Sequence, residues 1–212
     1  MKRANTGEIK LMFVDASHFV MGCDFLGYIY GAARRFIKTY SGRKRYNVLG
    51  ALDFVTKKVT TVTNNTYINS LVVCDFLKKI ASENIGETIY LVMDNASYQK
   101  CKLVQGLALE LGVNLVFIPS YSPNLNLIER FWKHVKGKLR TKSYDDFDIF
   151  KATIDSVVDD ADKVDKAIID KLIGEKVKLF DDLVAINENT FASNKTIKNN
   201  FTNYIPNVKA AA

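Results

Sequence analysis

Residues 115–139, LVFIPSYSPNLNLIERFWKHVKGKL, contain the clearest structural pattern in the chain. The stretch begins as a short apolar run, is interrupted by two prolines, and continues with apolar residues at three- and four-residue steps. Because proline continues neither a sheet ladder nor a helix, the pattern predicts a strand, a turn and an amphipathic helix. Asn124 and Asn126 are candidate N-caps of that helix. Glu129 comes early in the helix, beside its apolar stripe, so we expect it at the rim of the surface on which the helix packs.

Upstream of this stretch, the chain predicts strands first and then alternating helices and strands. Continuous apolar runs predict strands, and apolar residues at helical spacing predict helices. The predicted strands are residues 9–14, 27–31, 46–55, 57–63, 89–93 and 113–118, and the predicted helices are residues 67–80 and 96–111. Residues 48–63 have the pattern of a hairpin. This order predicts an α/β fold with a mixed sheet, whose later strands are parallel and covered by helices.

The composition changes after residue 142. Residues 145–172 are acidic and predicted to be helical, and the end of the chain is rich in Asn, Thr and Lys, which favours an extended or disordered tail. The predicted organisation is a core over residues 1–142, an acidic helical extension over residues 143–186 and a flexible tail over residues 187–212.

The bulk composition narrows the class of protein. The 212 residues are 48% hydrophobic and 25% charged, which suits one sizeable core. No apolar run reaches the roughly 18 residues of a membrane span, and the N-terminus lacks a signal-peptide pattern, so we expect a cytoplasmic protein. Three separated cysteines indicate a reducing compartment and argue against structural zinc. The net charge is +7 and its basic excess lies in residues 1–140, which favours a polyanionic partner.

Two of the predicted strands each end in an aspartate. Asp15 follows LMFV, and Asp94 follows YLVM. A carboxylate at the end of a buried strand needs a hydrogen bond, an ion pair or a bound metal. If Glu129 joined these two, the three would repel one another, and a divalent cation that prefers oxygen ligands would relieve the repulsion. The alternative for each aspartate is that it caps a turn. Asp53 is a fourth candidate, for which we favour a role in the hairpin turn.

Three blocks of the sequence resemble those of a known family. The blocks FVDASHF (residues 13–19), LVMDNASY (residues 91–98) and YSPNLNLIERFWK (residues 121–133) resemble the signature blocks of mariner-like bacterial insertion-sequence transposases. These enzymes belong to the DDE transposase and retroviral integrase superfamily. Between Asp94 and Glu129 lie 34 residues, the spacing expected from the resemblance. The third block reads NLNLIE where the family often reads DLNPIE, and neither departure removes an expected metal ligand.

The resemblance covers about residues 9–140 and implies both a fold and a reaction. The implied fold is a ribonuclease-H-like mixed five-stranded sheet flanked by helices. Asp15, Asp94 and Glu129 are implied as the catalytic residues and as the ligands of two Mg²⁺ or Mn²⁺ ions, which would activate the attacking water and stabilise the leaving 3′ oxygen. The implied reaction is cleavage of DNA at transposon ends and strand transfer into target DNA. The alternatives are a nuclease of the same fold that only hydrolyses and an inactive DNA-binding remnant.

Residues 34–46 place six basic side chains among three aromatic ones, which suits contact with phosphates and unpaired bases. The candidate DNA-contact residues are Arg34, Arg35, Lys38, Arg43, Lys44, Arg45, Lys133 and Lys136. Candidate accessory residues near the carboxylates are His18, Asn95 and Asn126. For His18 and Asn95, hydrogen bonding within a local turn is an equal alternative to contact with a phosphate or a metal-bound water.

Transposases of this kind carry helix-turn-helix DNA-binding modules ahead of the catalytic core. The first predicted strand begins at about residue 9, which leaves no room for them before it. We therefore expect the catalytic half of a split or truncated transposase, with end recognition supplied by a separate DNA-binding subunit. A homodimer is expected because two transposon ends must be processed together. The resemblance also implies association with the bacterial nucleoid.

Overall fold

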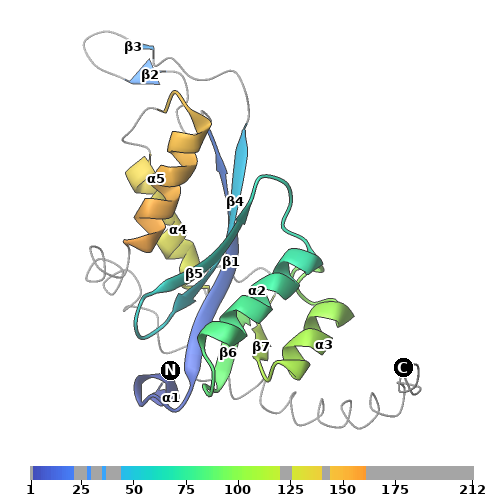
Figure 1. Ribbon diagram of the computed structural model, residues 1–212. Helices are drawn as coiled ribbons and strands as arrows, with labels where there is room; N and C mark the ends of the chain where they lie inside the picture. The colour runs from blue at the N-terminus through green and yellow to red at the C-terminus, as the bar shows by residue number, and fades with distance from the viewer. Residues whose placement is uncertain are drawn as a thin grey trace, which may run out of the picture. The chain divides into compact units, whose positions relative to one another are not determined.

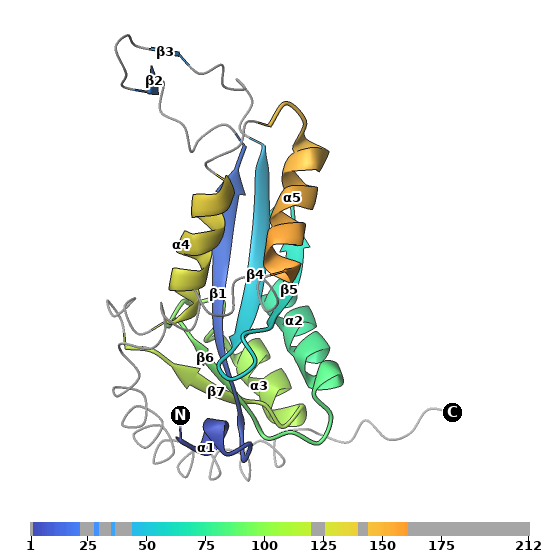
Figure 2. The same ribbon diagram turned by 90° about the vertical axis from the view of Figure 1, so that its left-hand side faces the viewer.

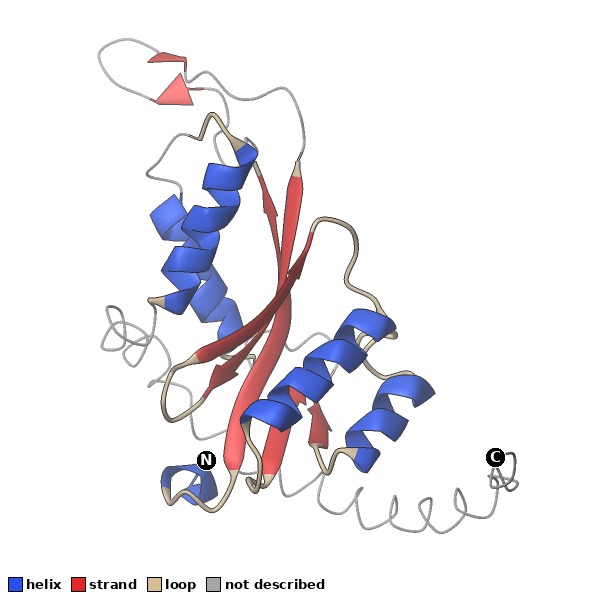
Figure 3. Ribbon diagram, in the orientation of Figure 1, coloured by secondary structure: helices blue, strands red, loops and turns tan. Residues whose placement is uncertain are grey.

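The computed structural model describes residues 2–21, 28–29, 35–36, 44–119, 126–139 and 144–160, with the side chains of residues 28–29 and 35–36 excepted. Figures 1 and 3 show the helices and strands of these residues. In chain order they are α1 (Lys2–Asn5), β1 (Lys10–Val20), β2 (Tyr28–Ile29), β3 (Arg35–Phe36), β4 (Arg45–Asp53), β5 (Val59–Asn64), α2 (Ser70–Glu83), β6 (Ile89–Met93), α3 (Lys102–Glu110), β7 (Asn114–Phe117), α4 (Ile128–Leu139) and α5 (Phe147–Asp159).

A five-stranded mixed sheet has the strand order β5-β4-β1-β6-β7. β1 pairs antiparallel with β4, and β4 pairs antiparallel with β5. On its other side β1 pairs parallel with β6, and β6 pairs parallel with β7. The predicted mixed sheet with parallel later strands is therefore confirmed, as is the predicted hairpin, which is formed by β4 and β5. β2 and β3 form a separate antiparallel pair.

Helices cover both faces of the five-stranded sheet, as Figures 1 and 2 show. On one face, α2 and α3 join the sheet in an apolar core that includes Met12 and Val14 of β1. The other face is covered by α4 and α5. Successive strand residues point to opposite faces, so Phe13 and Asp15 point toward the α4 face. The buried side chains of α4 recur at helical spacing and are Ile128, Phe131, Trp132, Val135 and Leu139.

β1 is longer than the sequence predicted. The apolar run predicted a strand that ends before Asp15, but the strand continues to Val20. Its pairing with β6 ends at Val14, whereas its pairing with β4 continues to Val20. Asp15 therefore lies within a strand, and the alternative that it caps a turn after the strand is wrong. The reason is that β4 supplies backbone partners beyond the end of β6, which a local apolar pattern does not reveal.

α3 begins later than predicted. Helical spacing predicted a helix over residues 96–111, but α3 begins at Lys102. Before it, the backbone carbonyl of Ala96 accepts hydrogen bonds from the N–H groups of Gln99 and Lys100, both at 3.0 Å. These bonds close a separate turn. The residues between β6 and α3 therefore form a loop and not the first turns of the helix.

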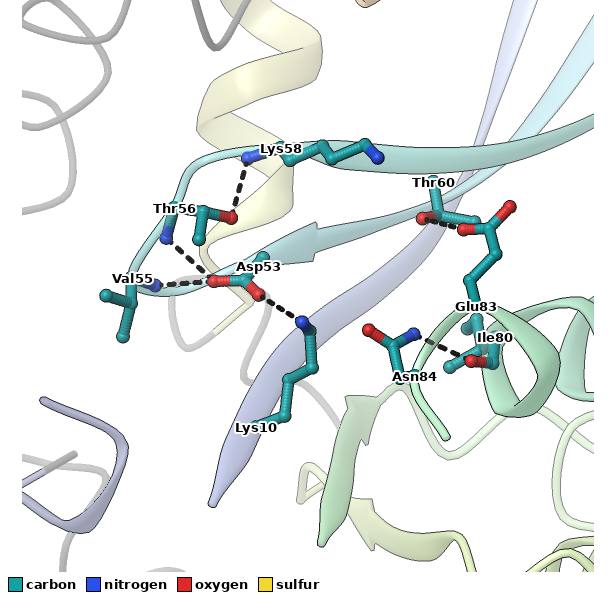
Figure 4. Close-up of polar contacts among 9 residues, drawn as sticks. All are labelled: Lys10, Asp53, Val55, Thr56, Lys58, Thr60, Ile80, Glu83 and Asn84. Carbon is teal, nitrogen blue, oxygen red and sulfur yellow. Dashed lines mark hydrogen bonds and ion pairs between the residues drawn. The ribbon is translucent and has the colours of Figure 1, made fainter. Parts of the chain in front are cut away.

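Asp53 closes the turn between β4 and β5 (Figure 4). Its Oδ1 accepts hydrogen bonds from the backbone N–H groups of Val55 and Thr56, both at 2.8 Å. Its Oδ2 lies 3.5 Å from Nζ of Lys10. Lys57 adopts a left-handed backbone conformation with a φ of 64° in the same turn. Because the turn itself satisfies this carboxylate, the structure supports the hairpin role that we favoured and not a fourth acidic site residue.

α5 lies within the segment that was predicted to be acidic and helical. It is joined to the sheet by Tyr46 of β4, whose hydroxyl donates to both carboxylate oxygens of Asp155, at 2.9 and 3.0 Å. The rest of the predicted helical extension and the tail, residues 161–212, lie outside the described residues. The predicted domain boundaries stay predictions. None of the described helices combines the length and the apolar character that crossing a lipid bilayer requires.

Candidate active site

The parallel pairing of β1 with β6 brings Asp15 and Asp94 next to each other. The last paired residues of the two strands are Val14 and Met93. Each aspartate is the next residue along its chain segment, and neighbouring strands lie about 4.8 Å apart. The two aspartates, which are 79 positions apart in the sequence, are therefore adjacent where β6 ends.

The helix α4 brings Glu129 to the same place. Its apolar stripe packs on the sheet, with the ring of Trp132 against Gly50 and 6.1 Å from the ring of Phe19, centroid to centroid. Gly50 stands directly opposite Asp15 in the ladder between β1 and β4. Directly opposed residues point to the same face of a sheet, so Asp15 faces α4. Glu129 lies one turn before Trp132 and is partly buried.

A cleft of about 430 Å³ lies between β1 and α4. Two carboxylates and two lysines border it, and Asp94 lies beside one of those carboxylates, Asp15. The cleft therefore combines acidic and basic groups on rigid elements. Its lining residues are Asp15, Ala16, Ser17, His18, Glu129, Trp132, Lys133 and Lys136.

Negative charge accumulates at this point of the sheet. Burial, and then the charges of Asp94 and Glu129, raise the pKa of Asp15 to about 7, although a hydrogen bond from the backbone of Ala16 and the charge of Lys136 act in the opposite direction. Burial and then the charge of Asp94 raise the pKa of Glu129. Among the described residues, no lysine or arginine forms an ion pair with any of the three carboxylates. The cluster is therefore short of compensating positive charge.

The carboxylates of Asp15, Asp94 and Glu129 suit a hard divalent cation, because such ions prefer carboxylate oxygens as ligands. The raised pKa values of Asp15 and Glu129 come in part from neighbouring negative charge, which a bound cation would offset. In the part of the chain that the structure describes, no three His, Cys, Asp or Glu side chains lie close enough together to enclose an ion. The carboxylates are thus neighbours beside a cleft and do not form a closed coordination sphere in this arrangement.

Asn126, predicted as a helix cap or an accessory residue, is buried just before α4. Its backbone carbonyl accepts a hydrogen bond from the N–H of Glu129 at 3.2 Å. Its side chain does not cap the helix. The Nδ2 group instead donates to the carbonyl oxygen of Val14 at 2.9 Å and approaches Oδ1 of Asp94 at 3.3 Å. The side chain therefore contacts both β1 and Asp94.

The other two accessory candidates, His18 and Asn95, are exposed. His18 lies in β1, and strand alternation directs it to the face opposite Asp15, although it borders the cleft. Its Nδ1 lies 2.6 Å from Oδ1 of Asn47, which is its cross-strand neighbour. This contact is a pair across the sheet and not a local turn. Asn95 follows Asp94 in the loop after β6.

Tyr98 is a residue near the carboxylates that sequence reasoning missed. It lies partly buried in the loop between β6 and α3. Its pKa is raised, first by burial and then by the charges of Asp15 and Asp94. In the sequence it is one of ten tyrosines, and its position four residues after Asp94 is the only signal that could have found it. The folded loop therefore brings Tyr98 close enough to Asp15 and Asp94 for their charges to act on it.

Four of the eight predicted DNA-contact side chains are described. Lys133 and Lys136 line the cleft beside the carboxylates, with Lys133 exposed and Lys136 partly buried. Lys44 and Arg45 are exposed at the start of β4. The structure therefore brings two of the four to the acidic site. The remaining side chains lie outside the described residues and are those of Arg34, Arg35 (a β3 residue), Lys38 and Arg43.

Comparison with known protein families gives one match. The model for the DDE superfamily endonuclease family matches residues 10–151 of this chain, a region that contains Asp15, Asp94 and Glu129. No match was found among curated proteins.

Several solved structures have a similar fold. The Mos1 transposase paired-end complex with its left transposon end has a TM-score of 0.61 at 15% identity, covering 84% of this chain and 55% of that one. The Mos1 transposase catalytic domain with raltegravir and Mn has a TM-score of 0.51 at 13% identity, and the match covers 73% of this chain and 78% of that one. A chain of the simian T-cell lymphotropic virus intasome in complex with the PP2A regulatory subunit B56 gamma has a TM-score of 0.50 at 15% identity, covering 73% and 48%. The similarity thus spans about half of the Mos1 transposase chain in the paired-end complex and about half of the intasome chain. These likenesses confirm the predicted ribonuclease-H-like fold.

Proposed function

This chain belongs to the DDE superfamily endonucleases, and on that premise we propose that it is the catalytic domain of a transposase, which cleaves DNA at transposon ends and joins the freed ends to target DNA. The observation that carries the proposal is the adjacency of Asp15 and Asp94 at the end of β6, with Glu129 of α4 bordering the same cleft as Asp15. Their charges act on one another, and two of them border a cleft that also contains lysines.

In this proposal Asp15, Asp94 and Glu129 hold two Mg²⁺ or Mn²⁺ ions. When bound, such ions supply activation of the attacking hydroxyl and stabilisation of the leaving 3′ oxygen. The chain contributes the carboxylates and holds them on rigid elements. The acidic cluster, which lacks an ion pair among the described residues, supports this assignment. So does the similar Mos1 catalytic domain, whose structure was solved with Mn.

Asp15 makes the binding of cations depend on pH. With a pKa of about 7, it carries a proton in about half of the cation-free molecules at neutral pH. That proton must leave before the carboxylate acts as a metal ligand. Cleavage at a fixed, subsaturating cation concentration should therefore increase as the pH rises through neutrality.

Lys133 and Lys136 suit contact with the DNA backbone beside the carboxylates. Both line the cleft that Asp15 and Glu129 border. Ammonium groups at such positions attract phosphates and draw the scissile segment toward the carboxylates. Lys44 and Arg45, with the basic segment before them, would extend the contact along the DNA.

Phosphate contacts of this kind position DNA without specifying its sequence. We therefore assign recognition of the transposon ends to a separate DNA-binding region or subunit. The similar Mos1 transposase forms a paired-end complex, and we extend that arrangement to a homodimer of this chain that processes two ends together.

The test is nicking of supercoiled plasmid by the 212-residue chain in Mg²⁺, Mn²⁺, Ca²⁺ or EDTA, with Asp94→Asn alongside. We expect nicking with Mg²⁺ or Mn²⁺ that Asp94→Asn abolishes. Pre-nicked oligonucleotides with transposon-like ends then test strand transfer, because joined products separate a transposase from a nuclease that only hydrolyses. If neither plasmid nor pre-nicked ends react with any cation, the chain is an inactive DNA-binding remnant and the proposal is wrong.

A further inference from the structure

Asn126 makes contacts with all three segments that carry the carboxylates. Only 2% of its surface is exposed. Its Nδ2 donates to the carbonyl of Val14, the residue before Asp15, at 2.9 Å and lies 3.3 Å from Oδ1 of Asp94. Its own carbonyl accepts the N–H of Glu129. The contact with Val14 spans 112 positions of the sequence.

The chemistry around the amide fixes its orientation. The carbonyl of Val14 and the carboxylate of Asp94 are both acceptors when the carboxylate is ionised, so a flipped amide would bring three oxygens together. The nitrogen must therefore face them. The amide oxygen has no hydrogen-bond partner among the described residues. A buried, partly unsatisfied amide is costly, so a residue of this kind at this place calls for a role beyond packing.

We propose that Asn126 is a positioning residue that holds Asp94 in place relative to Asp15 and Glu129. This inference rests on the function proposed above. Asp15 and Asp94 directly follow the last paired residues of two adjacent strands, so their ionised carboxylates repel each other and tend to move apart. Asn126 opposes that movement for Asp94, because its amide ties this side chain to the backbone of β1. The same residue ties the first turn of α4 to the site through its carbonyl.

Removal of such a support weakens metal binding without removing a ligand. Groups that orient metal ligands typically contribute about 10- to 100-fold to metal affinity or activity. Asn126→Leu keeps the approximate volume of the side chain and removes its hydrogen-bond donor. Asn126→Ala removes the donor and most of the side-chain volume. We expect each variant to bind Mn²⁺ about 10- to 100-fold more weakly than the unmodified chain.

Asn114 offers a matched control. Its Nδ2 donates to the carbonyl of Ile89 at 3.0 Å and so joins β7 to the beginning of β6, whereas Asp94 follows the end of that strand. Asn114→Leu therefore removes the same kind of bond, from a side-chain amide to a strand carbonyl, away from the carboxylates. It should lower the melting temperature and leave the affinity for Mn²⁺ unchanged.

The experiment measures Mn²⁺ binding by electron paramagnetic resonance and the Mn²⁺ concentration for half-maximal plasmid nicking, with thermal unfolding of each variant. Weaker Mn²⁺ binding and a higher half-maximal concentration in both Asn126 variants, with neither change in Asn114→Leu, would support the proposal. Unchanged Mn²⁺ affinity in a folded Asn126 variant would overturn it, and so would an equal loss in Asn114→Leu. Failure of both Asn126 variants to fold would also overturn it, because Asn126 would then be a folding residue.

The outcomes for the two proposals differ. Absence of Mn²⁺ binding and nicking in the unmodified chain is a failure of the proposed function. If the unmodified chain binds Mn²⁺ and nicks plasmid normally, and the Asn126 variants do so equally well, only the positioning role has failed.

Discussion

The indole ring of Trp132 occupies the space that a side chain on Gly50 would fill. An ideal Cβ atom on Gly50 would lie 2.7 Å from Cζ2 and 2.9 Å from Cη2 of that ring. Gly50 stands opposite Asp15 on the neighbouring strand. The missing side chain therefore lets α4 approach the sheet next to Asp15. Because Glu129 lies one turn before Trp132 on α4, this contact helps to set the separation between the two carboxylates.

Gly50→Ala should therefore destabilise the protein and impair the site. Overpacking of this kind costs about 1–3 kcal/mol in the free energy of unfolding, which urea denaturation would measure. We also expect nicking to decrease in the folded variant, because a displaced α4 moves Glu129. The control is Gly137→Ala on the same helix, where a Cβ atom meets nothing within 4 Å and a small gain of up to about 1 kcal/mol is expected. Unchanged stability in Gly50→Ala would contradict the close contact.

In EDTA, Asp15 should make the protein less stable as the pH rises from about 4 to about 7. Its pKa is 3.8 as an ordinary aspartate and about 7 in the folded protein, so the folded state binds more protons within that window. The free energy of unfolding then decreases as the pH rises. The difference in pKa corresponds to at most about 4 kcal/mol. Urea denaturation at about pH 5 and pH 8 would measure it.

The comparison for this pH effect is Asp15→Asn, which should lack the Asp15 contribution. Equal pH dependence in the two proteins would show that Asp15 has an ordinary pKa. Addition of Mg²⁺ at the higher pH should stabilise the unmodified chain more than Asp15→Asn, because ligand that binds only the folded state stabilises it.

Asp94→Asn should lower the pKa of Asp15 and of Glu129. The charge of Asp94 contributes to raising both values, and the substitution removes that charge. Nuclear magnetic resonance titration of the carboxyl groups would measure the change independently of any catalytic activity. Asp75→Asn, on the exposed surface of α2, is the control and should leave both values unaltered. Identical titration curves in Asp94→Asn would mean that the carboxylates do not converge.

Lys136→Met should raise the pKa of Asp15 and weaken DNA binding. The charge of Lys136 lowers the pKa of Asp15, and the Nζ of Lys136 lies 5.6 Å from the ring centroid of Phe19 in β1. If Lys136 contacts a phosphate, the slope of log affinity against log salt should decrease by about 1. Binding to a labelled duplex at several salt concentrations measures this slope. Lys78→Met on α2 is the control. An equal loss of DNA affinity in Lys78→Met would mean that DNA binding depends only on the net charge of the protein.

Much of the fold was predictable because its elements have local patterns. β6 occupies the predicted residues 89–93, and α4 has the predicted apolar stripe that includes Trp132. The late start of α3 and the extension of β1 were not predictable. The first depends on a turn that Ala96 closes, and the second depends on pairing with a strand that is distant in sequence.

The sequence by itself determined which residues could carry the chemistry, because apolar periodicity, strand-end aspartates and the spacing to Glu129 are properties of neighbouring residues. Only the tertiary structure decided how they meet. The register of β1 on β6 places Asp15 beside Asp94. The absence of a side chain on Gly50 leaves space for the ring of Trp132. The side chain of Asn126 donates a hydrogen bond to the carbonyl of Val14, which is distant in sequence. Register, close approach and long-range hydrogen bonds depend on pairs of residues far apart in the chain, and a local pattern contains no information on which partner a strand or a side chain will find.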